Sequence, residues 1–243
     1  IDLPGAQLWS PENPYLYTCR VTFGDDVREE KFGVRLLTCD AQCGMCINGE
    51  RVILRGACIH HENGILGAVN HPYADERKIK LLQKYGYNAI RSAHNPTSKA
   101  TLEACDRLGM LVLDEYVDMW YIHKNKYDFA SQFADEWQRD LKALVDRDYN
   151  HPSVVMYSTG NEVAETGQEK GIEFAGQMTK FIHTMDDRPV TCGINIFFNL
   201  LYSLGFGIYS DKKADSAAKA PKKKKSVGSE FFNDLAGILG ENL

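Results

Sequence analysis

From about residue 50 onward, short apolar segments alternate with longer amphipathic ones, and this alternation restricts the fold more than any other feature. The short segments have the composition of β-strands, and the segments between them carry apolar residues at helical spacing. Alternating strands and helices predict a parallel sheet with right-handed crossovers. The predicted strands are 51–56 leading into 58–60, then 88–91, 110–114, 153–157 and 189–193. The predicted helices are one with Ile79, Leu82 and Tyr85 on its apolar face, then 98–108, 130–149 and 170–185.

The loops after these strands distinguish between the two parallel folds that the alternation allows, a doubly wound sheet and a (β/α)8 barrel. A nucleotide-binding doubly wound sheet has a glycine-rich loop after its first strand. Here that loop is His60-His61-Glu62-Asn63-Gly64, which offers no phosphate cradle. Polar residues instead follow several different strands, at His60, His94, Asp118 and Glu162. A barrel assembles its site from many strand ends, so we expect an α/β fold that is an incomplete (β/α)8 TIM barrel.

The first forty residues have a different pattern. Residues 16–23 alternate as a strand, Gly24-Asp25-Asp26 interrupts them, and an extended pattern resumes at 31–35, which is typical of a hairpin. Two or three strands do not form a stable domain alone. We expect residues 1–40 to be the last strands of an immunoglobulin-like β-sandwich and residues 41–243 to be the first part of the barrel. Asn48-Gly49 predicts a tight hairpin turn close to this boundary.

Composition excludes several classes of protein. The chain carries a net charge of −5, which argues against a general nucleic-acid binder because phosphate contacts need a basic face. The run from Pro189 to Ser210 has no charge and could span a bilayer by length. Its prolines, asparagines and glycines favour a buried strand followed by buried helical and loop structure, so we expect no membrane segment. Seven irregularly spaced cysteines suggest reduced thiols in a cytoplasmic protein, although a periplasmic or secreted location stays open.

Two further segments were weighed for other roles. Cys43-Gly-Met-Cys46 is a CxxC motif, but no second pair completes a four-ligand zinc site. The segment 211–226 contains Lys222-Lys223-Lys224-Lys225, and such a run is expected to be a solvated loop because like charges repel. A short helix is predicted at about 229–239.

The residues with catalytic potential follow the predicted strands. Glu162 comes directly after a buried strand, beside Asn161, whose amide can bind a substrate hydroxyl. Burial favours the protonated carboxyl that a general acid needs. The structural alternative is a glutamate placed at a helix N-terminus, where the helix dipole favours it. His60 and His94 follow their strands by a similar offset, so both should line one rim.

Two further side chains complete the expected site. Trp120 offers a flat apolar face that could stack on a sugar ring, or it could cap the barrel core. Arg91, at a strand end, is expected to brace a carboxylate, with Glu162 as the first choice.

Four segments, in this order and spacing, resemble glycoside hydrolase family 2, which contains β-galactosidases, β-glucuronidases and β-mannosidases. They are Leu54-Arg55-Gly56 with His60-His61-Glu62-Asn63-Gly64, the segment Ile90-Arg91-Ser92-Ala93-His94-Asn95-Pro96, Leu113-Asp114-Glu115, and residues 147–153 leading to Gly160-Asn161-Glu162. The histidine motif and Gly-Asn-Glu followed by Val163 look most like β-galactosidases. The resemblance implies a retaining hydrolase of terminal β-D-galactosides with Glu162 as general acid/base. It also implies that Asn161, His60, His94, Asp118, Trp120 and Arg91 bind the substrate.

The sequence departs from this family in two ways. Metal-dependent relatives bind magnesium through a carboxylate and a histidine two positions later, but Trp120 stands two positions after Asp118, so we expect no metal and no cofactor. The family's nucleophilic Glu is not matched by Glu230 or Glu241. We therefore expect this chain alone to be inactive, and possible homo-oligomerisation if its sheet edge is exposed. The alternatives that stay open are a β-glucuronidase or another family 2 glycosidase, and a non-catalytic carbohydrate-binding barrel.

Overall fold

The central element is a five-stranded parallel sheet whose strands follow one another in chain order. The computed structural model describes residues 2–125 and 127–204. Within them, the sheet order is β10-β9-β8-β7-β6, with every neighbouring pair parallel. The strands are β6 (Gly56–Ile59), β7 (Ala89–Ser92), β8 (Leu111–Glu115), β9 (Val154–Asn161) and β10 (Val190–Gly193).

This strand order decides between the two parallel folds. In a doubly wound sheet the strand order reverses in the middle, because its two halves extend in opposite directions from a switch point. Here the order never reverses, so right-handed crossovers place successive helices on the same side of the sheet. Part of a (β/α) barrel is therefore the observed fold. The helices are α1 (Pro72–Lys84), α2 (Lys99–Leu108), α3 (Ala130–Asp148), α4 (Glu169–Ile182) and α5 (Ile196–Ser203), with short 3-10 turns at Gly64–Leu66 and Ala164–Gly167.

The helix ends follow local sequence signals. Ser98 caps α2, because its hydroxyl oxygen accepts a hydrogen bond from the Thr101 amide at 3.1 Å. Gly109 ends the same helix with a φ of 74°. A side chain there would also meet the Pro11 carbonyl oxygen, since an added Cβ would lie 2.1 Å from it. Helix α1 ends at Lys84, one residue before Tyr85, so Tyr85 is exposed and does not extend the apolar face as expected.

The two faces of the sheet bury different residues. Ile90 and Val112 pack outward with Ile79 of α1 and Leu102 of α2 in the main core. Their strand neighbours Ala89 and Leu111 face the other way, since successive side chains alternate across a strand. The second core consists of Ala89, Leu111 and Val155 packed with Trp9, Met45 and Ile47. Trp9, Met45 and Ile47 thus cover the end of the sheet at which the strands begin.

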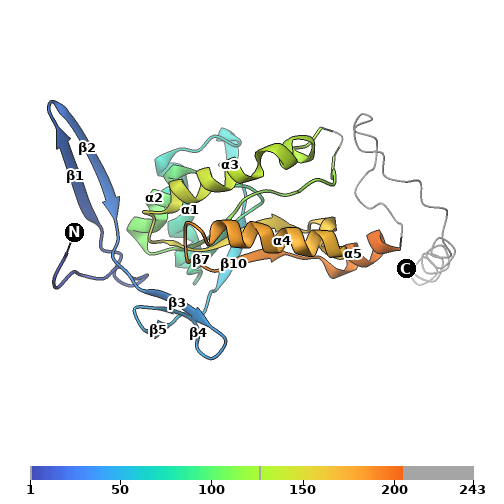
Figure 1. The fold of residues 1–243 in the computed structure, drawn as a ribbon. Coiled ribbons are helices and arrows are strands. Elements are labelled where there is room, and N and C mark those ends of the chain that lie inside the picture. The colour runs from blue at the N-terminus through green and yellow to red at the C-terminus, as the bar shows by residue number, and fades with distance from the viewer. Residues whose placement is uncertain (1, 126, 205–243) are drawn as a thin grey trace.

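The strands before residue 52 form two small antiparallel sheets. β1 (Tyr17–Phe23) pairs with β2 (Asp26–Phe32) in a hairpin that projects away from the barrel part (Figure 1). β3 (Leu37–Asp40), β4 (Gly44–Ile47) and β5 (Glu50–Arg51) form the other sheet, which crosses the boundary expected at residue 40. The predicted Asn48-Gly49 turn joins β4 to β5, with φ of 55° at Asn48 and 85° at Gly49.

A buried polar group, which we call the base cluster, ties the chain start to the sheet. It consists of Asp106 in α2, His151 and Ser153. His151 Nδ1 lies 2.5 Å from Asp106 Oδ2, and the Ser153 hydroxyl donates to Asp106 Oδ1 at 2.6 Å. The indole Nε1 of Trp9 donates to the backbone oxygen of Asp106 at 2.9 Å. Because Ser153 directly precedes β9, this cluster lies where the strands begin.

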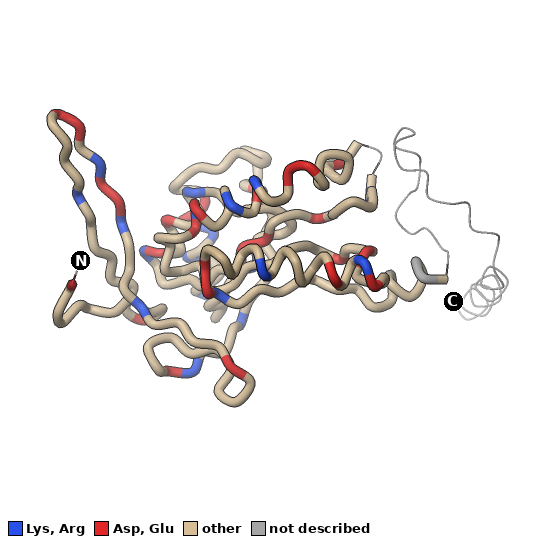
Figure 2. The backbone as a smooth tube through the Cα atoms, viewed as in Figure 1, with Lys and Arg blue, Asp and Glu red and all other residues tan. Residues whose placement is uncertain are grey.

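The end of the described chain agrees with the sequence only in part. α5 forms as expected, with Leu201 buried, but Ile196 and Phe197 are exposed. None of the helices in residues 2–125 and 127–204 is long and apolar enough to cross a membrane. The expected lysine-rich loop at 211–226 and the helix at 229–239 lie outside the described residues. All seven cysteines are free thiols. Basic and acidic residues are interspersed along the described chain (Figure 2).

Candidate active site

Glu162 follows β9 directly and has an unusual backbone conformation. Its φ is 45°, a left-handed value that non-glycine residues seldom adopt. Its amide donates to the Gly193 carbonyl at the end of β10, at 2.7 Å. Asn195 Nδ2 donates to Glu162 Oε1 at 3.1 Å, and the carboxyl is half-buried. The end of β10 therefore holds the backbone of Glu162, and Asn195, two residues after that strand, holds one carboxyl oxygen.

Asn161, the last residue of β9, has its side-chain amide oriented from both sides. Its Oδ1 accepts from Arg91 Nη2 at 2.8 Å, and its Nδ2 donates to Asp118 Oδ1 at 2.9 Å. The arginine has only donors and an ionised carboxylate only acceptors, so the amide cannot flip without losing both bonds. One amide hydrogen of Asn161 is thus committed to Asp118, and no hydrogen bond of the other is seen among residues 2–125 and 127–204.

Glu115, the last residue of β8, connects most of these side chains, although sequence reasoning did not select it. The carboxylate is fully buried. Its Oε2 accepts from Arg91 Nε at 3.0 Å, Arg91 Nη2 at 2.6 Å and the Ser158 hydroxyl at 2.7 Å. Its Oε1 lies 2.8 Å from His94 Nδ1. We call Arg91, His94, Glu115, Ser158 and Asn161 the rim network.

The partner of Arg91 corrects one sequence expectation. We expected Arg91 to brace Glu162, whereas the pair that the structure shows is with Glu115. The physical reason is strand register, because β7 and β8 are adjacent and their ends lie side by side. Burial lowers the pKa of Arg91, but the hydrogen bonds and charge of Glu115 outweigh it and raise the pKa overall. The signals for Glu115 in the sequence were its place at a strand end and its place in the Leu113-Asp114-Glu115 segment of the family resemblance.

His60 and His94 lie together, as their similar offsets after the strands predicted. Their ring centroids are 5.4 Å apart with an edge-to-face arrangement. His60 is exposed, whereas the His94 side chain is 25% exposed and reaches inward to Glu115. The peptide bond between Ala93 and His94 is cis. His60 thus lies on the outer side of the rim, and His94 lies on its inner side.

Asp118 joins the site through a lysine that the sequence did not reveal. Lys124 Nζ donates to Asp118 Oδ1 at 2.8 Å and to the Asn161 carbonyl oxygen at 2.6 Å. Burial raises the pKa of Asp118, but hydrogen bonds from Lys124 and Asn161 outweigh it, and the pKa is lowered overall. Asp118 therefore remains an ionised acceptor beside Asn161. No periodic pattern marks Lys124, because it lies in the irregular segment between β8 and α3.

Trp120 does not occupy the position expected of a sugar platform. Its side chain is fully buried, and its Nε1 donates to the Thr159 carbonyl at 2.8 Å. Its ring packs edge-to-face on Phe174 of α4, with centroids 5.7 Å apart. In this structure neither face of the indole is open to a ligand, so the alternative of a core-capping aromatic describes it correctly.

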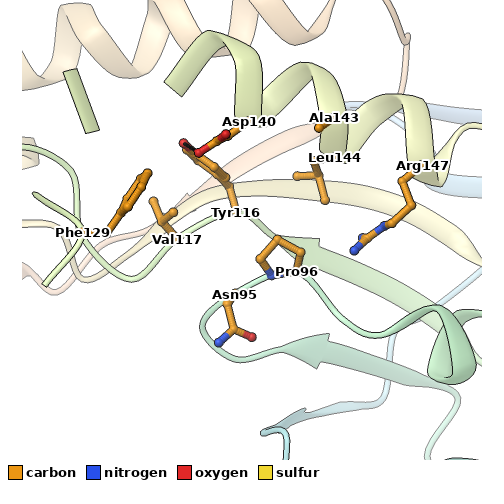
Figure 3. A pocket seen from close by; sticks show the side chains of 9 residues that line it. All are labelled: Asn95, Pro96, Tyr116, Val117, Phe129, Asp140, Ala143, Leu144 and Arg147. Carbon is orange, nitrogen blue, oxygen red and sulfur yellow. Dashed lines mark hydrogen bonds between the residues drawn. The ribbon is translucent and has the colours of Figure 1, made fainter. Parts of the chain in front are cut away.

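Two other features complete the description of the site. Within residues 2–125 and 127–204, no three His, Cys, Asp or Glu side chains gather closely enough to hold a metal ion. The expectation of a site without magnesium stays a prediction. An open hollow of about 440 Å³ lies between α3 and the loops that follow β7 and β8 (Figure 3). It is lined by apolar and loop residues together with Arg147 and Asp140, and none of the expected site residues contributes to it.

The fold is part of a (β/α) barrel, and a carboxyl, an amide and two histidines lie at the ends of its strands. These features place the chain in the class of barrel proteins whose site lies at the carboxyl ends of the strands. The comparison with known families narrows the class. Residues 41–227 match the TIM barrel domain of glycosyl hydrolases family 2, and residues 1–35 match another domain model of family 2. The chain belongs to glycosyl hydrolase family 2.

Relatives in this family carry several names, of which beta-galactosidase and beta-glucuronidase recur. The chain is 41% identical to Beta-galactosidase BoGH2A of Bacteroides ovatus over 65% of the chain and 19% of that protein. It is 39% identical to a putative beta-glucuronidase of Formosa agariphila over 67% of the chain and 16% of that protein. A family 2 crystal structure from Bacteroides cellulosilyticus aligns with a TM-score of 0.74 and 46% identity, covering 79% of this chain and 25% of that one. The chain thus spans a quarter or less of the length of these relatives.

Proposed function

We propose that the protein to which this chain belongs is a retaining β-galactosidase with Glu162 as its general acid/base. The observation that carries the proposal is the placement of Glu162. Its carboxyl lies at a strand end beside Asn161, and Asn195 binds Oε1 at 3.1 Å. The hydrogen bond from Asn195 holds the carboxyl of Glu162 in one orientation at the strand end. A general acid needs such a fixed position near the leaving oxygen.

The retaining mechanism needs a second carboxyl about 5–5.5 Å from the first. The second group attacks the anomeric carbon, and Glu162 protonates the departing oxygen. Glu162 then removes a proton from the water that releases the sugar. Asn161 would donate its second amide hydrogen to the hydroxyl next to the anomeric carbon. We propose that the nucleophile is supplied by a part of the protein outside this chain, so the pure chain should not turn over an aryl β-galactoside.

The charges around the site favour a neutral sugar over a uronic acid. Among the described residues, the cations bound to Asn161 are Arg91 and Lys124, and each is paired with a carboxylate, Glu115 and Asp118. Recognition of a sugar carboxylate needs a cation whose charge is not already balanced. Ionised Asp118 accepts hydrogen bonds from hydroxyls and repels an anion. These contacts support a galactoside as substrate, and a β-glucuronide is the second candidate because several relatives bear that name.

A panel of aryl glycosides on the whole protein tests this proposal. We expect the β-galactoside to be hydrolysed with a kcat/KM at least 100-fold above that of the β-glucuronide. The Glu162→Gln variant should lose about 10²- to 10⁴-fold in kcat, the range for a missing general acid. A reversed preference would establish the glucuronidase instead. Sugar binding without turnover of any glycoside would favour the non-catalytic carbohydrate-binding barrel.

A further inference from the structure

The rim network contains a histidine whose ring orientation depends on one buried carboxylate. His94 Nδ1 lies 2.8 Å from Glu115 Oε1, and Glu115 is fully buried. The other oxygen of Glu115 accepts three donors, two from Arg91 and one from Ser158. As the partner of a guanidinium, which has only donors, the Glu115 carboxylate is an acceptor. The hydrogen between Glu115 and His94 therefore resides on Nδ1.

We propose that Glu115 is a positioning residue that holds His94 as the Nδ1–H tautomer, so that Nε2 is a hydrogen-bond acceptor at the rim. Nδ1 faces the buried carboxylate, Nε2 is the other nitrogen of the same ring, and the His94 side chain is 25% exposed. The use of this acceptor to bind a sugar hydroxyl rests on the proposed function. The tautomer itself does not, because it follows from contacts within the chain.

The proposal extends to the kind of ligand group that fits. Nε2 of His94 and the carboxylate of Asp118 are both acceptors, so they require donors from the ligand. A sugar hydroxyl donates, whereas a uronate carboxylate only accepts. Asn161, held through Arg91 by the same Glu115, supplies the complementary donor. Glu115 thus sets the hydrogen-bonding polarity of His94, and it holds the Arg91 that donates to Asn161.

An isosteric substitution gives a sharp test. In Glu115→Gln, the amide oxygen must face Arg91, because the guanidinium has no acceptor. The amide NH₂ then faces His94 Nδ1, which must accept, and the ring proton moves to Nε2. We therefore expect the tautomer of His94 to reverse, which loss of packing alone would not cause.

The measurement is two-bond ¹H–¹⁵N NMR of the histidine rings in the full chain at pH 8, without ligand. The His94 signals are assigned by their absence in His94→Gln. We expect Nδ1–H in the wild type and Nε2–H in Glu115→Gln. The exposed control Glu103→Gln, whose side chain is 47% exposed, should leave His94 unchanged. His151, which faces Asp106 through Nδ1, is an internal reference that should keep its tautomer in every variant.

The outcomes separate this inference from the proposed function. An Nε2–H or doubly protonated His94 in the wild type overturns the inference, even if Glu115→Gln does not fold. An unchanged Nδ1–H tautomer in folded Glu115→Gln overturns it as well. The predicted tautomers together with a whole protein that hydrolyses no β-galactoside would leave the inference standing and remove the galactosidase proposal.

Discussion

The rim network and the base cluster use the same side-chain types at opposite ends of one sheet. Each is centred on a buried carboxylate, Glu115 in one and Asp106 in the other. Each carboxylate meets a histidine Nδ1 and accepts a serine hydroxyl. At the base, the serine and the histidine both bind the aspartate, so the group is not a nucleophilic triad, in which histidine would lie between the other two.

The difference between the two clusters lies in what surrounds them. His151 is 9% exposed, and Trp9 covers the cluster from the chain start. At the rim, the contacts continue from Arg91 through Asn161 to Asp118, and His60 lies exposed beside His94. Carboxylate, histidine and serine therefore do not define a site by themselves. Their position at the carboxyl ends of the strands, with polar atoms still available to a ligand, distinguishes the rim.

The largest effect that we expect is a loss of folding stability when the base cluster is disrupted. Asp106→Ala leaves His151 and Ser153 buried without their acceptor, at a cost of about 1–3 kcal/mol for each unsatisfied group. We expect the free energy of unfolding to fall by about 3 kcal/mol or more, measured by urea denaturation. The exposed control Asp146→Ala removes only a surface ion pair with Lys142 and should cost under about 1 kcal/mol. Equal losses in the two variants would contradict a structural role for the base cluster.

A smaller loss of folding stability is expected when only Trp9, which covers the base cluster, is changed. Trp9→Phe keeps an aromatic ring but leaves the buried Asp106 carbonyl without the indole donor. We expect a loss of about 1–3 kcal/mol in the free energy of unfolding. Phe23→Ala, at the exposed tip of the β1–β2 hairpin, is the matched control and should change stability little. If Trp9→Phe were as stable as the wild type, the chain start would not seal the sheet as the structure indicates.

The sequence predicted the order of elements well, because each relied on a local signal. The Asn48-Gly49 turn and the end of α2 at Gly109 are backbone requirements that only a few residues satisfy. Alternation of strands and helices identified the sheet, and the offsets of His60 and His94 placed them together. These features depend on near neighbours in the chain, so sequence alone could reveal them.

The contacts of the site were less predictable, because they join residues from different strands and loops. Glu115 pairs with Arg91 through the register of β7 against β8, which no local pattern encodes. Lys124 and Asn195 lie outside the strands, where periodicity carries no information. For Trp120, the sequence showed an aromatic near a strand end but not whether the ring turned inward. The Thr159 carbonyl and Phe174 account for its burial.

The smallest expected effect is the pH dependence contributed by Asp118 at the rim. Its pKa is lower in the folded chain than the usual value near 3.9, because Lys124 and Asn161 bind the carboxylate. Its stabilising contribution is therefore present above about pH 4 and is lost as the pH falls through the folded-state value. We expect Asp118→Asn to lower the free energy of unfolding more at pH 6 than at pH 3. Asp25→Asn, in the exposed β1–β2 turn, is the control variant. A larger effect of Asp118→Asn at pH 3 than at pH 6 would contradict this account.

The role of Glu162 as the proton donor at the rim is tested most directly by leaving-group dependence in the whole protein. A general acid matters most when the departing oxygen is basic. We expect Glu162→Ala to lose about 10²-fold or more in kcat/KM on phenyl β-galactoside, and far less on a dinitrophenyl β-galactoside, whose leaving group needs no proton. An equal loss on both substrates would show that Glu162 does not protonate the leaving group, and would contradict the assignment of this carboxyl.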